Sequence, residues 1–419
     1  MKIVGELPDW DLSALYSSFD LEFHDDVSRC KEFVNRLKEW CKNKREIPKK
    51  QKIAQYVKQE EEFRQLHERV HRYATLVYLA NNDNQEARHA LAETTAVLGL
   101  WNSSRVPFLR WLSELTDDEL KCICDEHIER LLALAKHTGT VREERFAQAF
   151  RNTGSRVLNS LYEQTLSSTK GKGGLSLAQC RSLHSSPSMD RRILAFDDTV
   201  DICQQVGKTA EQCLNSIAGE WCTLADIARF SSPLEQALFL CKTDEQTLSG
   251  LLNAIEEMLP SFHSFFHLKA KLLGENSPLP YHSLVAPLPG PLPDEFSLLE
   301  AKELINKHFS ACSADAAAIA QRAFAHNWID MKPRRNKCPG AFCHPLRAVG
   351  ESRILVNYTG SFGDVLTLAH ELGHAFHNSC LDGDNIWTQE YSIAIAETAS
   401  VFCELLLLNG LIKDSSTEQ

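Results

Sequence analysis

The chain contains 419 residues, of which 43% are hydrophobic and 24% are charged. This composition is typical of soluble globular proteins and leaves room for two or three domains, so disordered and collagen-like classes are excluded. The formal net charge of -11 and the pI of about 5.8 argue against a nucleic-acid partner, because neutralising phosphates requires a basic surface.

The N-terminal stretch MKIVGELPDWDLSALY lacks the apolar core of an export signal. No run approaches the roughly eighteen apolar residues of a membrane span. We therefore expect a cytoplasmic protein without a membrane partner. In that compartment the fourteen cysteines are expected to be reduced thiols.

Helical periodicity dominates the first 270 residues. Apolar side chains recur at gaps of three and four in residues 50–80, which predicts an amphipathic helix of several turns. The same spacing predicts further helices at residues 27–40, 86–100, 117–136, 190–218 and 245–274. After them, the proline-dense stretch VAPLPGPLP (285–293) predicts an extended connection, because prolines fix φ and remove hydrogen-bond donors.

One segment has the composition of a β-strand. Residues SRILVNYTG (352–360) place Ile354, Leu355, Val356 and Tyr358 between turn signals. This strand lies directly before a helical stretch that carries the chemistry of the chain.

Residues LTLAHELGHAFHN (366–378) place two histidines and a glutamate in an otherwise apolar helical pattern. On a helix, His370 and His374 project from one face and can share a metal ion at about 2.0 Å from each nitrogen. Glu371 is rotated by roughly a quarter turn, where a general base for metal-activated water must stand. The alternative is that both histidines only form hydrogen bonds in a helical core. A third ligand decides between these interpretations.

Two patterns for that third ligand can be compared. The extended pattern H-E-x-x-H-x-x-G-x-x-H is excluded, because His377 and Cys380 occupy the places of its glycine and third histidine. The better candidate is Glu397 in residues 390–410, whose composition predicts a helix enclosed by protein. A carboxylate in such a helix must be paired or bound to metal, because burying it alone costs several kcal/mol. The loop LDGDN (381–385) is expected to bring this helix back beside the first.

Three neighbours of these residues are further candidates. Glu404 lies two turns after Glu397 and can either orient a ligand histidine or pair with an arginine. His377 can line the substrate cleft or be a partly exposed helix histidine. Gly373, between the two histidines, is expected to let another backbone approach closely.

With these motifs the chain resembles the thimet oligopeptidase and oligoendopeptidase F family of zinc peptidases. The opening WDLSALYSS (10–18) is similar to the oligoendopeptidase F branch in particular. The resemblance implies that His370, His374 and Glu397 hold zinc and that Glu371 is the catalytic glutamate. The segments that carry it are LAHELGHAFH (368–377), IAETASVFCE (395–404), NKCPGAFC (336–343) and RILVNYTGSFGDVLTLAHELGH (353–374).

The resemblance also implies a fold and a class of substrate. The fold is mainly α: a helical, clam-like body with a deep channel, a zinc helix with the H-E-x-x-H motif and a small β element before it. The channel admits short peptides and excludes folded proteins. Residues 352–358 would hold the substrate backbone as an added strand. The implied substrate contacts are Val356, Tyr358, Gly360, Gly340 and His377.

We expect three parts: an N-terminal helical domain at 1–110, a helical connecting lobe at 111–190 and a zinc catalytic domain at 191–419. Family members usually continue much further beyond the glutamate helix, whereas this sequence ends fifteen residues after Glu404. A C-terminal truncation, or a second chain that completes the site, is therefore expected. The expected function is zinc-dependent hydrolysis of short unfolded peptides. The alternatives are a non-catalytic or weakly active peptide-binding remnant and a non-peptidase zinc hydrolase.

Overall fold

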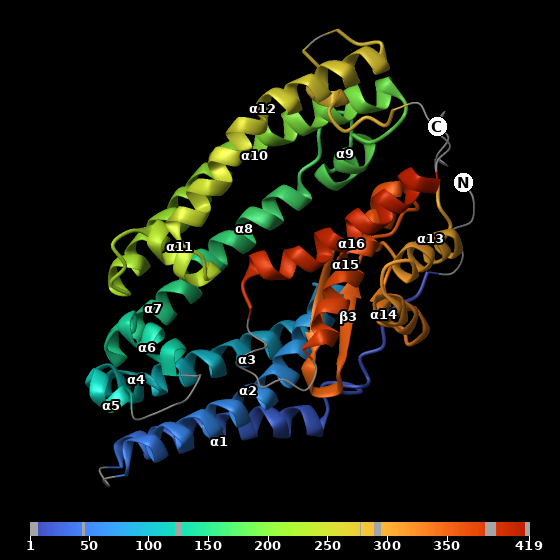
Figure 1. The fold of residues 1–419 in the computed structure, drawn as a ribbon. Helices are drawn as coiled ribbons and strands as arrows, with labels where there is room; N and C mark the ends of the chain where they lie inside the picture. The colour runs from blue at the N-terminus through green and yellow to red at the C-terminus, as the bar shows by residue number, and fades with distance from the viewer. Residues whose placement is uncertain are drawn as a thin grey trace. The chain divides into compact units, whose positions relative to one another are not determined.

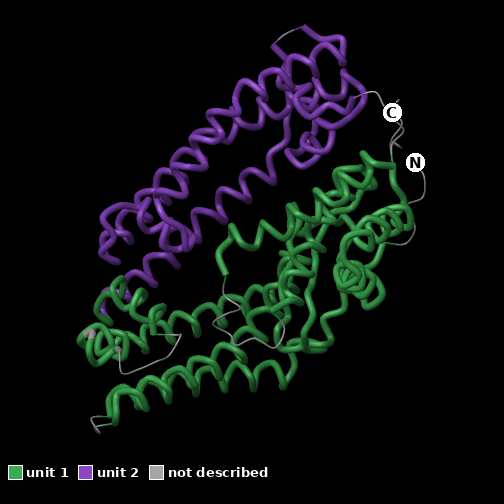
Figure 2. The backbone as a smooth tube through the Cα atoms, in the orientation of Figure 1, with its two compact units in different colours: residues 1–141, 292–419 green, residues 142–291 purple. Residues whose placement is uncertain are grey.

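The computed structural model describes residues 7–43, 47–121, 128–276, 278–288, 295–381 and 391–414. The described chain is mainly helical with one small sheet, which confirms the expected fold class (Figure 1). Its contacts form two compact units: unit 1 comprises residues 1–141 and 292–419, and unit 2 comprises residues 142–291 (Figure 2). The three-part division at residues 110 and 190 stays a prediction.

The first part of unit 1 is helical, as its apolar spacing predicts. In the second helix, Ile53, Tyr56, Phe63 and Val70 are fully buried, so the predicted apolar face is the packed one. The segment predicted at 117–136 forms two described helices, and residues 122–127 lie outside the described residues. The helices are α1 (Leu21–Lys42), α2 (Lys49–Ala80), α3 (Gln85–Ser104), α4 (Val106–Ser113), α5 (Asp117–Lys121) and α6 (Ile128–Lys136).

The second part of unit 1 holds the sheet and four helices among its described residues. The strand order is β1-β3-β2, with β1 parallel and β2 antiparallel to β3. In the central strand, Ile354 pairs with Ile329 of β1 and with Cys343 of β2. The elements are α13 (Leu298–Ser310), α14 (Ala314–Ala325), β1 (Ile329–Asp330), β2 (Phe342–Leu346), the 3-10 turn η2 (Arg347–Val349), β3 (Glu351–Leu355), α15 (Phe362–Cys380) and α16 (Ile393–Asp414).

The sheet lies between two hydrophobic clusters of unit 1. Leu346 of β2 packs in the cluster built by α1 to α4 and α6. Ile354 of β3 packs in the cluster built by α13 to α16. The predicted strand is therefore confirmed as β3, although it ends at Leu355. Sequence alone missed β2, because His344 and Pro345 interrupt any strand-like run.

Unit 2 is helical throughout its described elements, and the helices predicted at 190–218 and 245–274 are confirmed. A glycine-rich loop closes over Asp198, whose carboxylate accepts from the backbone N–H groups of Gly173 and Leu175 at 2.6 and 2.9 Å. In the proline-dense stretch, residues 289–293 lie outside the described residues. The elements are α7 (Val141–Thr153), α8 (Ser155–Ser168), α9 (Leu177–Leu183), α10 (Met189–Ile227), α11 (Pro233–Cys241), α12 (Glu245–Leu273) and the 3-10 turn η1 (Tyr281–Ser283).

Candidate metal centre

Helix α15 begins at a capping box that fixes it to the strand before it. The Ser361 side chain accepts from the Asp364 backbone N–H at 3.1 Å. The Asp364 carboxylate in turn accepts from the backbone and hydroxyl of Thr359 at 2.8 and 2.7 Å. The first of these bonds satisfies a donor that the helix start leaves open. The direction of α15 is therefore set where the chain leaves β3.

Helix α16 lies directly against α15 at Gly373. A Cβ atom on Gly373 would stand 2.8 Å from the Ala399 carbonyl oxygen and 2.9 Å from Ser400 Cα. No side chain larger than hydrogen fits there unless one helix moves. The expectation that Gly373 allows a close backbone approach is confirmed. The loop at 381–385, expected to join these helices, lies outside the described residues from 382 onward.

His370, His374 and Glu397 come together where the two helices meet. Their ligand atoms all lie within 4.8 Å of one another. Glu397 Oε2 is 3.2 Å from His370 Nε2 and 3.6 Å from His374 Nε2. Two ligands on a tetrahedral zinc, each about 2.0–2.1 Å from the ion, are about 3.3 Å apart. These separations therefore fit the donor set of one zinc ion.

Glu404 orients the first of these histidines. Its carboxylate contacts His370 Nδ1, and in a neutral ring that nitrogen carries the proton. The Nε2 lone pair of His370 then faces the carboxylate of Glu397, an arrangement that is repulsive unless a cation or a proton lies between them. Burial lowers the pKa of His374, which keeps that ring neutral as a metal ligand must be. The Ser400 hydroxyl donates to Glu397 Oε2 at 2.8 Å.

Glu371 is the buried carboxylate beside this group. Its side chain is 4% exposed, and its Oε2 has no hydrogen-bond partner among the described residues. Burial, followed by the negative charges of Glu397 and Glu404, raises the pKa of Glu371 to about 8. A perturbed, unpartnered carboxylate next to a donor triad is the usual setting of a catalytic acid or base.

The expectation that the helix of Glu397 is enclosed by protein is wrong for the described structure. The Glu397 side chain is 47% exposed, and Val401, Phe402 and Leu405 are also exposed. Among the described helices, α16 alone is long and apolar enough to cross a membrane by composition, contrary to expectation, and only 17% of its most apolar stretch is buried. Core helices pass the same test, so this is weak evidence of a membrane span. The composition of α16 could not predict how much of the helix is buried.

The predicted mode of substrate binding is also corrected. Strand β3 is central: β2 pairs with it along Glu351–Leu355, and β1 pairs with Ile354 and Leu355 on the other edge, so a peptide cannot add to the part that both strands cover. The side chains of Val356 and Tyr358 are buried, and the Tyr358 hydroxyl donates to the Phe296 carbonyl at 3.0 Å. Among the described strands, β1 and β2 both lie at an edge of the sheet, and β2, with five residues, is the longer of the two.

The two predicted glycine contacts lie in tight backbone turns. Gly340 has φ +89°, directly before β2, and Gly360 has φ +94°, directly before α15. The Gly340 carbonyl accepts from Asn357 Nδ2 at 3.1 Å. The Gly360 carbonyl accepts from the Phe296 backbone N–H at 2.7 Å. Both carbonyls are therefore engaged within the protein, and Gly340 remains next to the open strand edge.

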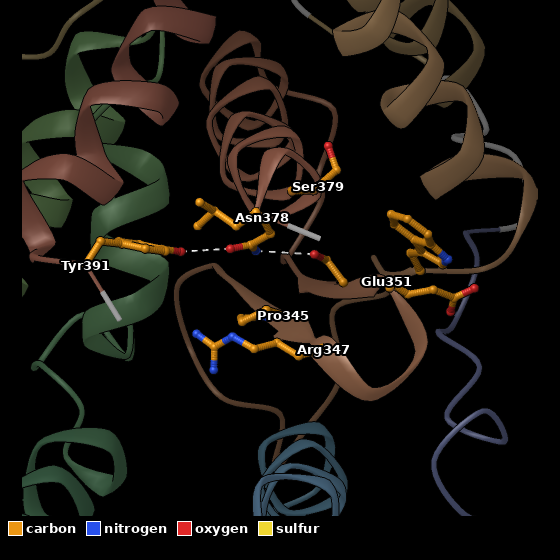
Figure 3. Close-up of a pocket in the computed structure, with 11 residues that line it drawn as sticks. Pro345, Arg347, Glu351, Asn378, Ser379 and Tyr391 are labelled. Atoms are coloured by element: carbon orange, nitrogen blue, oxygen red, sulfur yellow. Dashed lines mark hydrogen bonds between the residues drawn. The ribbon is translucent and has the colours of Figure 1, made fainter. Parts of the chain in front are cut away.

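A pocket lies at the C-terminal end of α15, beyond the three candidate ligands (Figure 3). His377 packs edge-on against Tyr391 near this pocket, with ring centroids 4.5 Å apart. His377 Nε2 is buried without a hydrogen-bond partner among the described residues. The labelled lining residues are Pro345, Arg347, Glu351, Asn378, Ser379 and Tyr391.

Residues 306–419 match the family model for Peptidase family M3. The chain is 25% identical to Oligoendopeptidase F, chromosomal, of Lactococcus lactis subsp. cremoris over 239 residues, which are 57% of this chain and 39% of the relative. It is 25% identical to Oligopeptidase PepF of Bacillus subtilis (strain 168) over 235 residues, which are 56% of this chain and 35% of the relative. The match thus spans less than half the length of these curated relatives.

Solved structures share the fold. PZ peptidase A with inhibitor 2 matches with a TM-score of 0.72 and 16% identity, over 90% of this chain and 67% of that chain. Oligoendopeptidase-F from Enterococcus faecium matches with a TM-score of 0.60 and 16% identity, over 94% of this chain and 67% of that chain. The chain is therefore similar to peptidase family M3 over residues 306–419 and to oligoendopeptidase F relatives over slightly more than half of its length.

Proposed function

We propose that this chain is a zinc-dependent endopeptidase that hydrolyses short unfolded peptides. The observation that carries the proposal is the group of His370, His374 and Glu397 beside the buried, unpartnered carboxylate of Glu371. The match of residues 306–419 to Peptidase family M3 supports the reaction class. The cytoplasmic location, and a second chain that completes the site, remain predictions.

Zinc held by the two histidines and Glu397 would supply positive charge that polarises a peptide carbonyl and acidifies water. Glu371 takes the proton of the attacking water and passes it to the leaving amine. Its ionised form is favoured once the negative charge of Glu397 is neutralised, because that charge contributes to its raised pKa. Glu404 keeps the His370 ring in the orientation and tautomer that this role requires.

The peptide backbone is proposed to add to β2. An extended peptide pairs with an unoccupied strand edge through its main-chain groups. Pro345 suits an edge, since proline lacks the N–H that a central strand needs. Among the described residues, Cys343 of β2 contacts Asn378 of α15. A peptide on this edge would therefore run beside the helix that carries Glu371.

Replacing Glu371 by Gln tests the proposal. The variant should bind zinc as the wild type does, while cleavage of a quenched oligopeptide falls by about 10²- to 10⁴-fold. Glu303→Gln, at an exposed position on α13, is the matched control and should retain full activity. Equal cleavage by the wild type and the Glu371 variant would refute the proposed base. Zinc binding without any cleavage by the wild type would favour the non-catalytic, peptide-binding alternative.

A further inference from the structure

Tyr391 and Asn378 join three segments of unit 1. The Tyr391 hydroxyl donates to Asn378 Oδ1 at 2.7 Å, and Asn378 Nδ2 donates to Ser352 Oγ at 3.3 Å (Figure 3). The Tyr391 ring also lies edge-on to His377 at an interplanar angle of 84°. Tyr391 precedes α16 by two residues. The start of α16 is thus tied to α15 and, through Asn378, to β3.

Contacts between α15 and α16 show that the two helices run antiparallel. Glu404 contacts His370 at one end, and Ser400 lies against Gly373 further along. Tyr391 contacts His377 at the other end. Glu397 falls between the contacts made by residues 400 and 391. The candidate ligand is therefore held from both sides.

The first turn of α16 has few buried apolar contacts to hold it in place. Glu397 is about half exposed, and Ile393 and Ile395 in the same turn are 69% and 53% exposed. Burial therefore does little to fix this end of the helix. Metal–ligand distances tolerate only about 0.2 Å of error. Specific contacts must then set where the Glu397 carboxylate lies.

We propose that Tyr391 and Asn378 are positioning residues for the metal site: their hydrogen bond sets the first turn of α16 so that Glu397 meets the two imidazoles. The inference rests on the proposed zinc site. It assigns a role to two residues outside the three candidate ligands. Groups that hydrogen-bond a metal ligand typically change metal affinity by about 10- to 100-fold when removed, and this bond acts on Glu397 through the first turn of α16.

Tyr391→Phe keeps the ring against His377 and removes only the hydroxyl. We expect its zinc dissociation constant, measured by chelator competition, to rise by about tenfold or more. Asn378→Ala also removes the bonds to Ser352 and Cys343, so it should weaken zinc binding at least as much. The double variant should be no worse than Asn378→Ala, because the bond that Tyr391→Phe removes is then already lost. The urea midpoint of metal-free Tyr391→Phe should not change. Tyr281→Phe, at a 62% exposed position in unit 2, is the control and should bind zinc like the wild type.

The outcomes are separable. If the wild type binds zinc and Tyr391→Phe binds it equally well, the positioning role is refuted while the proposed function stands. Additive effects of the two substitutions on zinc affinity would also refute it, because the two residues would then act independently. A fall in the urea midpoint of Tyr391→Phe that parallels its loss of zinc affinity would refute it as well, because the hydroxyl would then only stabilise the fold. If the wild type binds no zinc, the proposed function itself fails.

Discussion

Gly373→Ala tests the geometry of the metal site most directly. The added Cβ would lie 2.8 Å from the Ala399 carbonyl oxygen and 2.9 Å from Ser400 Cα. Both are backbone atoms, so no side-chain rotation can make room. Reaching an ordinary contact of 3.4 Å with Ser400 Cα requires α16 to retreat by about 0.5 Å. Glu397 lies one turn before Ser400 and would move with it.

The expected magnitudes differ for folding and for metal binding. Overpacking costs about 1–3 kcal/mol, while alanine in place of glycine inside a helix returns up to about 1 kcal/mol. The free energy of unfolding of the metal-free protein should therefore fall by about 0–2 kcal/mol. A displacement of about 0.5 Å exceeds the tolerance of metal–ligand distances, about 0.2 Å. Zinc affinity should thus fall by at least about tenfold.

Gly363→Ala is the matched control on the same helix. A Cβ there would meet only Ser361 Oγ, at 3.6 Å, so nothing has to move. This variant should keep wild-type zinc affinity and gain up to about 1 kcal/mol in unfolding free energy. Urea unfolding of the metal-free proteins and zinc titration against a chelator measure the two quantities. If Gly373→Ala binds zinc as tightly as Gly363→Ala, the close helix contact does not determine where Glu397 lies.

Two further predictions concern buried ionisable side chains in and next to the sheet. Lys337→Met leaves the fully buried carboxylate of Asp330 with Arg334 as its remaining cation, and the lost charged hydrogen bond should lower the free energy of unfolding by about 2 kcal/mol in urea melts. The same change at Lys42, in an exposed ion pair, should have almost no effect; equal losses would contradict this. Burial and then the Arg72 charge lower the pKa of His344 to about 3, below its ordinary 6.5, so wild-type stability should fall as pH drops below 6.5. The stability of His344→Gln should respond less to pH between 6.5 and 4, and parallel curves would count against a buried neutral ring.

The helices and the candidate base could be predicted from sequence because their signals are local. The spacing of apolar residues in 50–80 predicted α2, because the apolar face of a helix is set by its own sequence. His370, Glu371 and His374 share one helix, so their relative directions follow from 3.6 residues per turn. Gly373 was expected to admit another backbone because it lies between the two histidines.

The partners of those residues depend on segments far apart in the chain, and only the tertiary structure decided them. The edge position of β2 and the central position of β3 follow from pairing with β1, which two residues form. Sequence identified Glu397 by assuming a buried helix, yet its carboxylate is half exposed and approaches the histidines because α16 packs on Gly373. Local periodicity states which side chains share a face. It does not state which faces meet, because that depends on the packing of elements that are distant in sequence.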